Sequence, residues 1–294
     1  MHPNAEQPFR ERIRELPRLG LGISTEFGAG ASGLDVVALG DRRPDLVGFL
    51  EIGVDLERGI DADAERWIGR GRPVTYHFLD VNLEEPEDVD DAWVRDTREL
   101  ARRTGAAWIC GDAGLWHVGP REHGHGLLLP PILVRESAEV MAEAVRGLRR
   151  RLGFEILPEN PPAHAYVGDM HILEYFGHMA SLADSGLLLD VAHLVIHQRA
   201  MGKSPMTGLE AFDLSRVVEV HIAGGTPFEH DGRTFLDDDH GPDVLAETWE
   251  VFERIAQGAV NLKATVVECE RNQVETVLPI FERAHDILER AGRL

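Results

Sequence analysis

The sequence predicts an α/β protein built as a single (β/α)8 TIM-type barrel, and three observations support this prediction. Eight short apolar runs alternate with amphipathic segments along the chain. The length of 294 residues is typical of one barrel of this kind. Ionisable residues follow seven of the eight apolar runs, at the strand ends where this fold builds its active sites.

The apolar runs have the length of strands rather than of helices. Residues 106–110, for example, contain only Ala, Trp, Ile and Cys. Continuous apolar strands are typical of a parallel sheet that is covered on both faces. We therefore predict eight strands, at residues 19–23, 47–52, 74–79, 106–110, 154–158, 186–191, 217–222 and 264–269.

The segments between these runs have the periodicity of amphipathic helices. Val89, Trp93, Thr97 and Leu100 follow one another at spacings of three and four, which places them on one face of a helix at residues 88–103. The same spacing recurs further along the chain. It predicts helices at residues 131–151, 168–184, 243–257 and 273–290, with shorter candidates at 34–39 and 60–68.

The chain reads as one domain with a short extension in front of it. Residues 1–18 are polar and charged, and we expect them to precede a barrel at residues 19–294. Two connections are longer than a barrel needs. Residues 111–131 are rich in Gly and His, and residues 224–241 are rich in Asp. Long loops in a compact domain are usually functional or disordered.

Net charge, apolar stretches and cysteine positions indicate which partners and which cell compartment to expect. The formal charge of −21 repels phosphate backbones and anionic lipid, so we expect neither nucleic acid nor a membrane as partner. No apolar stretch reaches the ~18 residues of a membrane-spanning helix. Cys110 and Cys269 both lie in apolar runs, and no signal-peptide pattern is present, which together predict a cytoplasmic protein.

The polar residues at the strand ends form a set of carboxylates and imidazoles. A surface loop or a helix cap explains any one of them, but not the whole set, since several are flanked by apolar residues. Buried carboxylates and imidazoles need partners, and shared metal ions supply them. We expect the metal ligands to come from His77, Asp112, Glu159, Asp190, His193, His221, Asp238, His240 and Glu268. Candidate catalytic residues beside them are Glu51 and Glu270, for proton transfer or for orienting the imidazoles, and Asn160.

The types of ligand restrict the metal. The absence of a Cys cluster disfavours structural zinc and iron–sulfur sites. Mixed imidazole and carboxylate ligands suit iron, manganese or catalytic zinc. The candidates outnumber the ligands that one ion takes, so two or three ions that share bridging carboxylates are expected.

The remaining histidines have weaker patterns. His171 and His178 lie on one predicted helix face, where packing or solvation explains them. His197 is a candidate second-layer partner of the site. Three histidines of the 111–131 loop lie on the correct side of the barrel, and whether one of them reaches the site stays open: His117, His123 and His125.

Short motifs follow one another between residues 19 and 270. They are Phe49-Leu50-Glu51, Tyr76-His77, Glu159-Asn160-Pro161, Leu187-Leu188-Leu189-Asp190-Val191, Val218-Glu219-Val220-His221-Ile222-Ala223-Gly224, Asp238-Asp239-His240-Gly241 and Val267-Glu268. In identity, order and spacing they resemble the motifs of the multinuclear non-heme iron-dependent oxidases, the family that includes the iron oxidase of methanobactin biosynthesis.

The resemblance implies a barrel that binds two or three irons in Fe2+ and Fe3+ states and takes molecular oxygen as co-substrate. It implies a peptide substrate, often modified at Cys, in natural-product biosynthesis, or a related small molecule, and allows for a partner protein that presents the substrate. The implied metal ligands are His77, Glu159, Asp190, His221, Asp238, His240 and Glu268, with Asp112 matching the Asp of an Asp-His pair.

Two positions depart from the family pattern. The His of the Asp-His pair is Ala113 here, and the family's Val-Asn-Asn is Val191-Ala192-His193. One ligand is therefore lost while another imidazole appears nearby. His193 and His117 are both candidates to replace it, and the number of ions and the substrate stay open.

Two other functions compete with the oxidase. A xylose-isomerase-like sugar isomerase or epimerase would place similar residues at its strand ends and use Mn2+ or Mg2+ without oxygen. A non-catalytic metal-binding or scaffold barrel would explain the loss at Ala113. A barrel endonuclease is disfavoured by the charge of −21 and the lack of a basic stripe.

Overall fold

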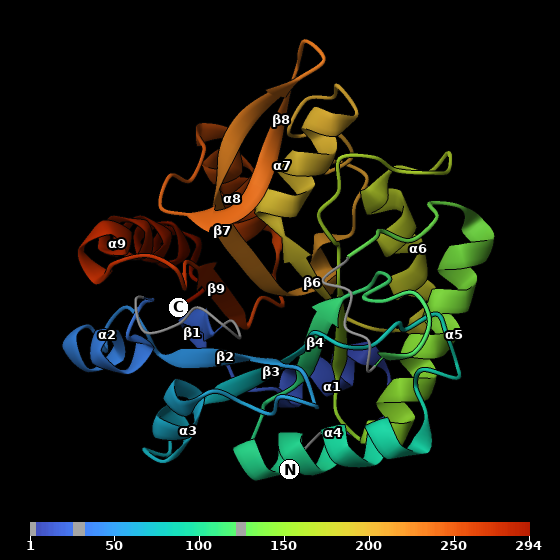
Figure 1. Ribbon diagram of the computed structural model, residues 1–294, viewed down its shortest axis with the longest axis horizontal. Helices are drawn as coiled ribbons and strands as arrows, with labels where there is room; N and C mark the ends of the chain where they lie inside the picture. The colour runs from blue at the N-terminus through green and yellow to red at the C-terminus, as the bar shows by residue number, and fades with distance from the viewer. Residues whose placement is uncertain (1–3, 26–32, 122–127) are drawn as a thin grey trace.

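Eight parallel strands close into a barrel in the computed structural model, which describes residues 4–25, 33–121 and 128–294. The strands are β1 (Gly20–Thr25), β2 (Phe49–Val54), β3 (Val74–Phe78), β4 (Ile109–Asp112), β5 (Ile156–Glu159), β6 (Leu187–Asp190), β7 (Val217–His230) and β9 (Ala264–Glu268). The hydrogen-bonded order runs β6-β5-β4-β3-β2-β1-β9-β7, and the pairing of β6 with β7 closes the ring (Figure 1). The predicted barrel is therefore confirmed.

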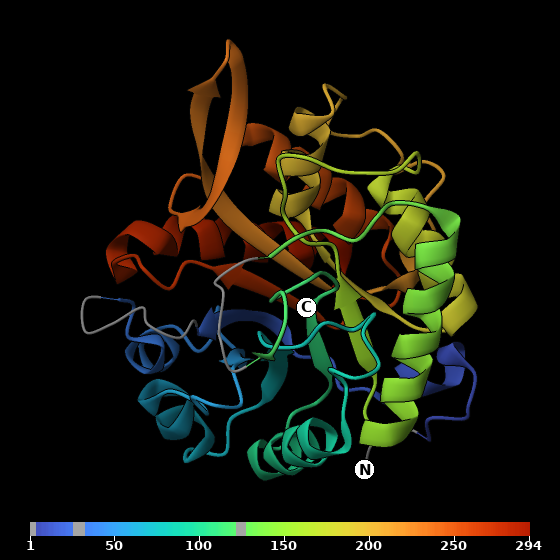
Figure 2. The ribbon, with the colours of Figure 1, turned by 45° about the vertical axis from the view of Figure 1, so that its right-hand side comes forward.

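Helices surround the barrel on its outside, as Figures 1 and 2 show. Those that match the sequence prediction are α2 (Val36–Arg42), α3 (Ala62–Ile68), α4 (Asp91–Thr104), α5 (Arg135–Leu152), α6 (Ile172–Ala183), α8 (Ala246–Gly258) and α9 (Val274–Ala291). Asp35, Asp61 and Asp90 accept a backbone N–H at the first turns of α2, α3 and α4, which stabilises these helix starts. No helix in the described part of the chain is long and apolar enough to cross a bilayer.

The helix α1 (Phe9–Glu15) forms within the residues expected to be a polar extension. Its apolar residues Phe9 and Ile13 are buried together with Leu16 against the lower end of the barrel interior, including Trp108 and Leu157. The charged residues of this segment hid its apolar face in the sequence. The segment closes the end of the barrel that lies opposite the strand C-termini.

The helix α7 (Val191–Ala200) follows β6 directly and was not predicted. Almost every residue of α7 is buried, so it has no polar face and therefore no amphipathic pattern to detect. Asp190 caps this helix by accepting the backbone N–H of His193 at 2.5 Å. The first turn of α7 therefore does two things: Asp190 caps the helix there, and His193 is directed toward the barrel end.

The prediction of a long loop at residues 224–241 is wrong. The second half of β7 continues beyond the barrel and returns as the antiparallel strand β8 (Arg233–Gly241), in a hairpin that projects from the barrel in Figure 2. Most residues around the tip are exposed, so the hairpin has no apolar alternation. Its local signal in the sequence is the Asp231-Gly232 pair, whose positive φ values of 50° and 70° are those of a tight two-residue hairpin turn.

The interior of the barrel changes character along its axis. At the α1 end it is apolar, and it includes Phe49, Trp108 and Leu157. Alternate residues of a strand point to the same face, so the next inward residue along β4 is Cys110 and the one after it is Asp112. The barrel thus passes from an apolar floor through a polar layer to the ionisable strand ends.

Candidate metal centre

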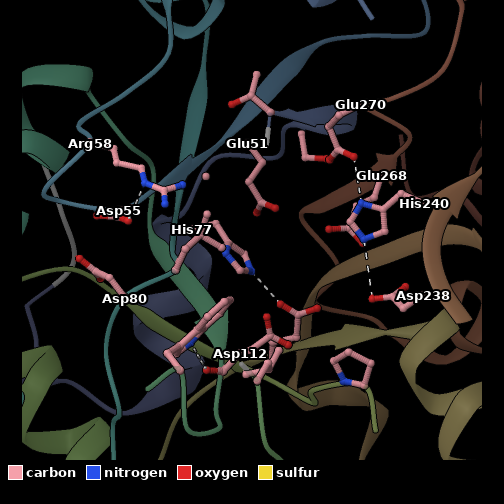
Figure 3. Close-up of a pocket in the computed structure, with 18 of the residues that line it drawn as sticks. Glu51, Asp55, Arg58, His77, Asp80, Asp112, Asp238, His240, Glu268 and Glu270 are labelled. Carbon is pink, nitrogen blue, oxygen red and sulfur yellow. Dashed lines mark hydrogen bonds and ion pairs between the residues drawn. The ribbon is translucent and has the colours of Figure 1, made fainter. Parts of the chain in front are cut away.

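Register between neighbouring strands brings the ionisable residues to one level. Asp112 of β4 is the cross-strand partner of Glu159 on β5, and Asp190 of β6 is the partner of His221 on β7. Residues opposite each other on paired strands lie close together. Figure 3 shows the result, in which side chains from most strands of the barrel face one cavity.

The β7–β8 hairpin supplies two further side chains. Asp238 and His240 lie on β8 where the hairpin returns to the barrel rim (Figure 3). His240 Nε2 lies 3.8 Å from both Asp238 Oδ2 and Glu268 Oε2. Its other nitrogen, Nδ1, lies 2.9 Å from Glu270 Oε2, so Glu270 fixes the ring.

All nine residues predicted as metal ligands converge in this region. Several groups of three have ligand atoms within 4.8 Å of one another, and four of them overlap in series. They are Glu51–His77–His221, His77–Asp112–Glu159, Glu159–Asp190–His193 and Asp190–His221–Glu268. Because neighbouring groups share Glu159, Asp190, His77 and His221, adjacent ions in this arrangement would have ligands in common.

His193 rather than His117 has a ring nitrogen turned toward this cluster. His193 donates from Nδ1 to the carbonyl oxygen of Asn160 at 2.8 Å, and its Nε2 lies 3.1 Å from Asp238 Oδ2. His117 donates from Nδ1 to Gly119 at 2.7 Å, and its Nε2 lies 3.1 Å from Asp88. Both nitrogens of His117 are therefore engaged away from the cluster. His123 and His125 lie outside the described residues.

The catalytic candidates occupy different positions. Glu51 and Glu270 line the cavity, and each lies next to an imidazole of the cluster, at His221 and His240. Asn160 does not face the cavity with its side chain. Its amide group makes a reciprocal pair of 2.9 Å hydrogen bonds with the backbone of Asp190, so it positions that residue.

Several buried carboxylate oxygens in the cluster have no hydrogen-bond donor in the described structure. Buried polar atoms are nearly always paired, and leaving one unpaired costs about 1–3 kcal/mol. Bound cations would pair with all of these oxygens, and oxygen and imidazole ligands suit iron, manganese and zinc. The unpaired atoms are Asp112 Oδ1, Glu159 Oε1, Asp190 Oδ2, Asp238 Oδ1 and Glu268 Oε2. The residues present therefore fit a metal cluster.

The charges of the cluster shift each other's protonation. Burial disfavours the protonated ring of His77, but the hydrogen bond to Glu159 and the charge of Glu51 raise its pKa to about 9. Burial and the charge of Glu159 raise the pKa of Asp112 to about 8. Burial opposes ionisation of Glu268 as well, yet neighbouring imidazoles hold its pKa well below the usual range. Without metal, protons neutralise the cluster.

Metal binding is therefore expected to release protons and to strengthen as the pH rises. In the metal-free protein His77 keeps its proton up to about pH 9 and Asp112 up to about pH 8, and a ligand must lose its proton to coordinate. Affinity for Zn2+ or Co2+ should thus fall as the pH is lowered from about 9. Titrations at a series of pH values and in buffers of different ionisation enthalpy measure both effects. An affinity independent of pH would contradict the expectation.

The hairpin root provides a test of the contribution of β8. A Cβ at Gly224 would lie 2.1 Å from the carbonyl oxygen of Gly241, its cross-strand partner. Gly224→Ala should push β8 away and lower the metal content while the barrel still folds. Gly147→Ala is the control, because no heavy atom lies within 4 Å of a Cβ there. Elemental analysis measures the metal content, and thermal unfolding shows whether the barrel still folds. A full metal content in Gly224→Ala would contradict a contribution of β8 to the ligands.

The cavity above the cluster holds about 610 Å3. Its outer wall comes from the loops after β2, β3 and β4, with Asp55, Arg58, Asp80, Trp116 and Arg121. Figure 3 shows Arg58 and Asp55 across the cavity from Asp238 and His240. Trp116 and Arg121 lie in the long 111–131 loop, whereas Asp55, Arg58 and Asp80 lie in short loops without any periodic pattern and had no signal in the sequence.

Comparison with known proteins places the chain in a family. A family profile described as RiPP precursor modification enzyme MbnB/TglH/ChrH matches residues 30–289. A UPF0276 protein of Neisseria meningitidis serogroup B is 28% identical over 229 residues, which cover 76% of this chain and 77% of that protein. A UPF0276 protein of Caulobacter vibrioides is 25% identical over 230 residues, covering 73% and 80%.

Solved structures show the same fold at low identity. A xylose isomerase-like TIM barrel protein from Mycobacterium smegmatis in complex with magnesium has a TM-score of 0.56 at 13% identity, covering 95% of this chain and 98% of that one. D-allulose 3-epimerase from Methylomonas sp. has a TM-score of 0.52 at 16% identity, covering 95% and 96%. These structures confirm the xylose-isomerase-like barrel. The profile match spans most of the sequence, so this chain belongs to the MbnB/TglH/ChrH family of RiPP precursor modification enzymes.

Proposed function

We propose that this protein is a multinuclear non-heme iron enzyme that uses molecular oxygen to modify a peptide, at or near a Cys residue, in natural-product biosynthesis. The observation that carries the proposal is the set of unpaired, buried carboxylate oxygens beside imidazoles at the strand ends. Family membership supports the peptide as substrate. Two or three ions fit the overlapping groups of ligands, with manganese and zinc as the alternatives to iron.

The overlapping groups of ligands correspond to neighbouring ion positions. His77, Asp112 and Glu159 would hold one ion, and Asp190, His221 and Glu268 another. The departure at Ala113 removes an imidazole from the first position. His193, together with Asp238 and His240, would complete a third position at the hairpin. Bound iron would supply redox chemistry with oxygen and a Lewis acid for a substrate thiolate.

The chain itself contributes binding, orientation and proton transfer. The cavity of about 610 Å3 has room for a short peptide segment above the ligands. Glu51 and Glu270 hold the rings of His221 and His240. Glu270 also lines the cavity, where its carboxylate can accept a proton from a substrate group.

The test is an oxygen-uptake assay with protein purified anaerobically and loaded with Fe2+. The substrate is a precursor peptide encoded beside the gene, added with and without any pathway partner encoded there. We expect oxygen consumption and a mass change at a Cys of the peptide. Zn2+-loaded protein is the control, since zinc has no redox chemistry. Iron-loaded protein that neither consumes oxygen nor alters the peptide under all these conditions would contradict the proposal.

A further inference from the structure

A second polar layer lies inside the barrel directly below the candidate metal ligands. It contains Glu51, Thr75, Cys110 and Glu219, each at most 1% exposed. Thr75, Cys110 and Glu219 precede His77, Asp112 and His221 by two residues on their strands, so they point to the same interior one step lower. Neither family membership nor the proposed chemistry explains why polar groups continue below the ligands.

Glu51 connects this layer to the ligands. Its Oε1 lies 3.0 Å from Nε2 of His221. Its Oε2 lies 3.1 Å from Sγ of Cys110 and 3.3 Å from Oγ1 of Thr75, which both point at it as donors. One carboxylate oxygen is thus held from below while the other faces the imidazole.

His221 presents its other nitrogen to the carboxylates of the cluster. Its Nδ1 lies 3.3 Å from Glu268 Oε1 and 3.5 Å from Glu159 Oε1. Neither ring nitrogen is aligned for a hydrogen bond, and the ring is fully buried. The close ion-pair contact of Nε2 with Glu51 Oε1 at 3.0 Å is therefore what restrains that side of the ring, and Nδ1 is the atom left to coordinate an ion.

Glu219 forms the opposite side of the layer. Its Oε2 accepts a 2.6 Å hydrogen bond from Trp108 Nε1, and its Oε1 is buried without a hydrogen-bond partner. Potential ligand atoms of Glu219, Cys110 and Glu51 lie within 4.8 Å of one another. Keeping two buried carboxyl groups around one thiol is costly, and a structural role alone is met more cheaply by apolar side chains.

We propose that Cys110 is a positioning residue of the metal centre, whose thiol holds Glu51 so that Glu51 orients His221 toward the ion. Outer partners of this kind fix the ring orientation of a ligating His, and their loss typically lowers metal affinity about 10–100-fold. The inference rests on the metal centre of the proposed function and is independent of its oxygen chemistry.

Cobalt(II) binding to the metal-free protein is the test, because its visible spectrum reports on ligand geometry. Cys110→Ala should lower the affinity for Co2+ by about 10–100-fold and change the visible bands. Cys110→Ser keeps a donor and should restore both. Thr75→Val removes the more distant donor to the same oxygen and should cause a smaller loss. Cys269→Ala is the matched control, since that buried thiol makes a long 3.8 Å contact to the Val267 carbonyl rather than a contact to Glu51.

Three outcomes would overturn the inference. Cys110→Ala could bind Co2+ with wild-type affinity and spectrum. Cys110→Ser could be as impaired as Cys110→Ala, which would assign the effect to packing. Wild-type protein could show a near-ultraviolet thiolate-to-cobalt band that Cys110→Ser removes, which would make the thiol a ligand. Cobalt binding that follows the prediction in a protein that consumes no oxygen would contradict only the proposed function.

Discussion

Glu159→Ala is expected to remove most of the bound metal and all of the activity. Glu159 is shared by two overlapping ligand groups, and its Oε1 lies 3.5 Å from both His193 Nδ1 and His221 Nδ1. Its Oε2 lies 2.8 Å from His77 Nε2. Loss of a ligand at the centre of the cluster should lower metal affinity more than loss of an outer partner does. We therefore expect the metal affinity of Glu159→Ala to be more than about 100-fold below that of the wild type.

Elemental analysis after dialysis against a weak chelator measures the metal retained per chain. His178→Ala is the control, since it also removes an imidazole, but from the surface of α6, where the ring contacts Arg135. Circular dichroism and thermal unfolding of the metal-free variants establish that both fold. Glu159→Ala protein that retains the wild-type number of ions would contradict the bridging role.

The barrel could be predicted because its strands are buried on both sides and therefore continuously apolar. The run at residues 264–269, for example, becomes β9, which ends at Glu268, one residue before the predicted end. The hairpin, α1 and α7 could not be predicted in this way. β8 has Leu236 as its one buried residue and therefore no buried face, and α7 is buried on all sides, so neither has a two-faced pattern.

The candidate ligands could be predicted because strand order fixes where strand ends meet. Asp112 and Glu159 are 47 positions apart in sequence, yet they are cross-strand partners in the sheet. The layer below was missed because Cys110 reads as one more apolar residue of a buried strand. Its only signal is the spacing of two residues to Asp112, which places both on one face.

The second large effect is expected at the opposite end of the barrel, at the ion pair of Arg12 with Glu155. Arg12 Nε lies 2.7 Å from Glu155 Oε2 and Nη2 lies 3.1 Å from Oε1, with both side chains 1% exposed. Arg12→Ala leaves the carboxylate of Glu155 buried without its cation. Breaking a buried pair in this way costs about 3–5 kcal/mol of the free energy of unfolding.

Chemical denaturation of the metal-free protein measures this loss, and two variants define its cause. The double variant Arg12→Met, Glu155→Leu should recover most of the stability, because apolar residues of similar volume replace a buried pair at little or no cost. Arg42→Ala breaks the exposed pair with Glu275, at 57% and 74% exposure, and should cost less than about 1 kcal/mol. A double variant as unstable as Arg12→Ala would show that the contacts of Arg12 itself, which include hydrogen bonds to the carbonyls of Gln7 and Asp184, and not the stranded charge, hold α1 to the barrel. Because α1 lies at the end of the barrel away from the ligands, the folded variants should bind Co2+ as the wild type does.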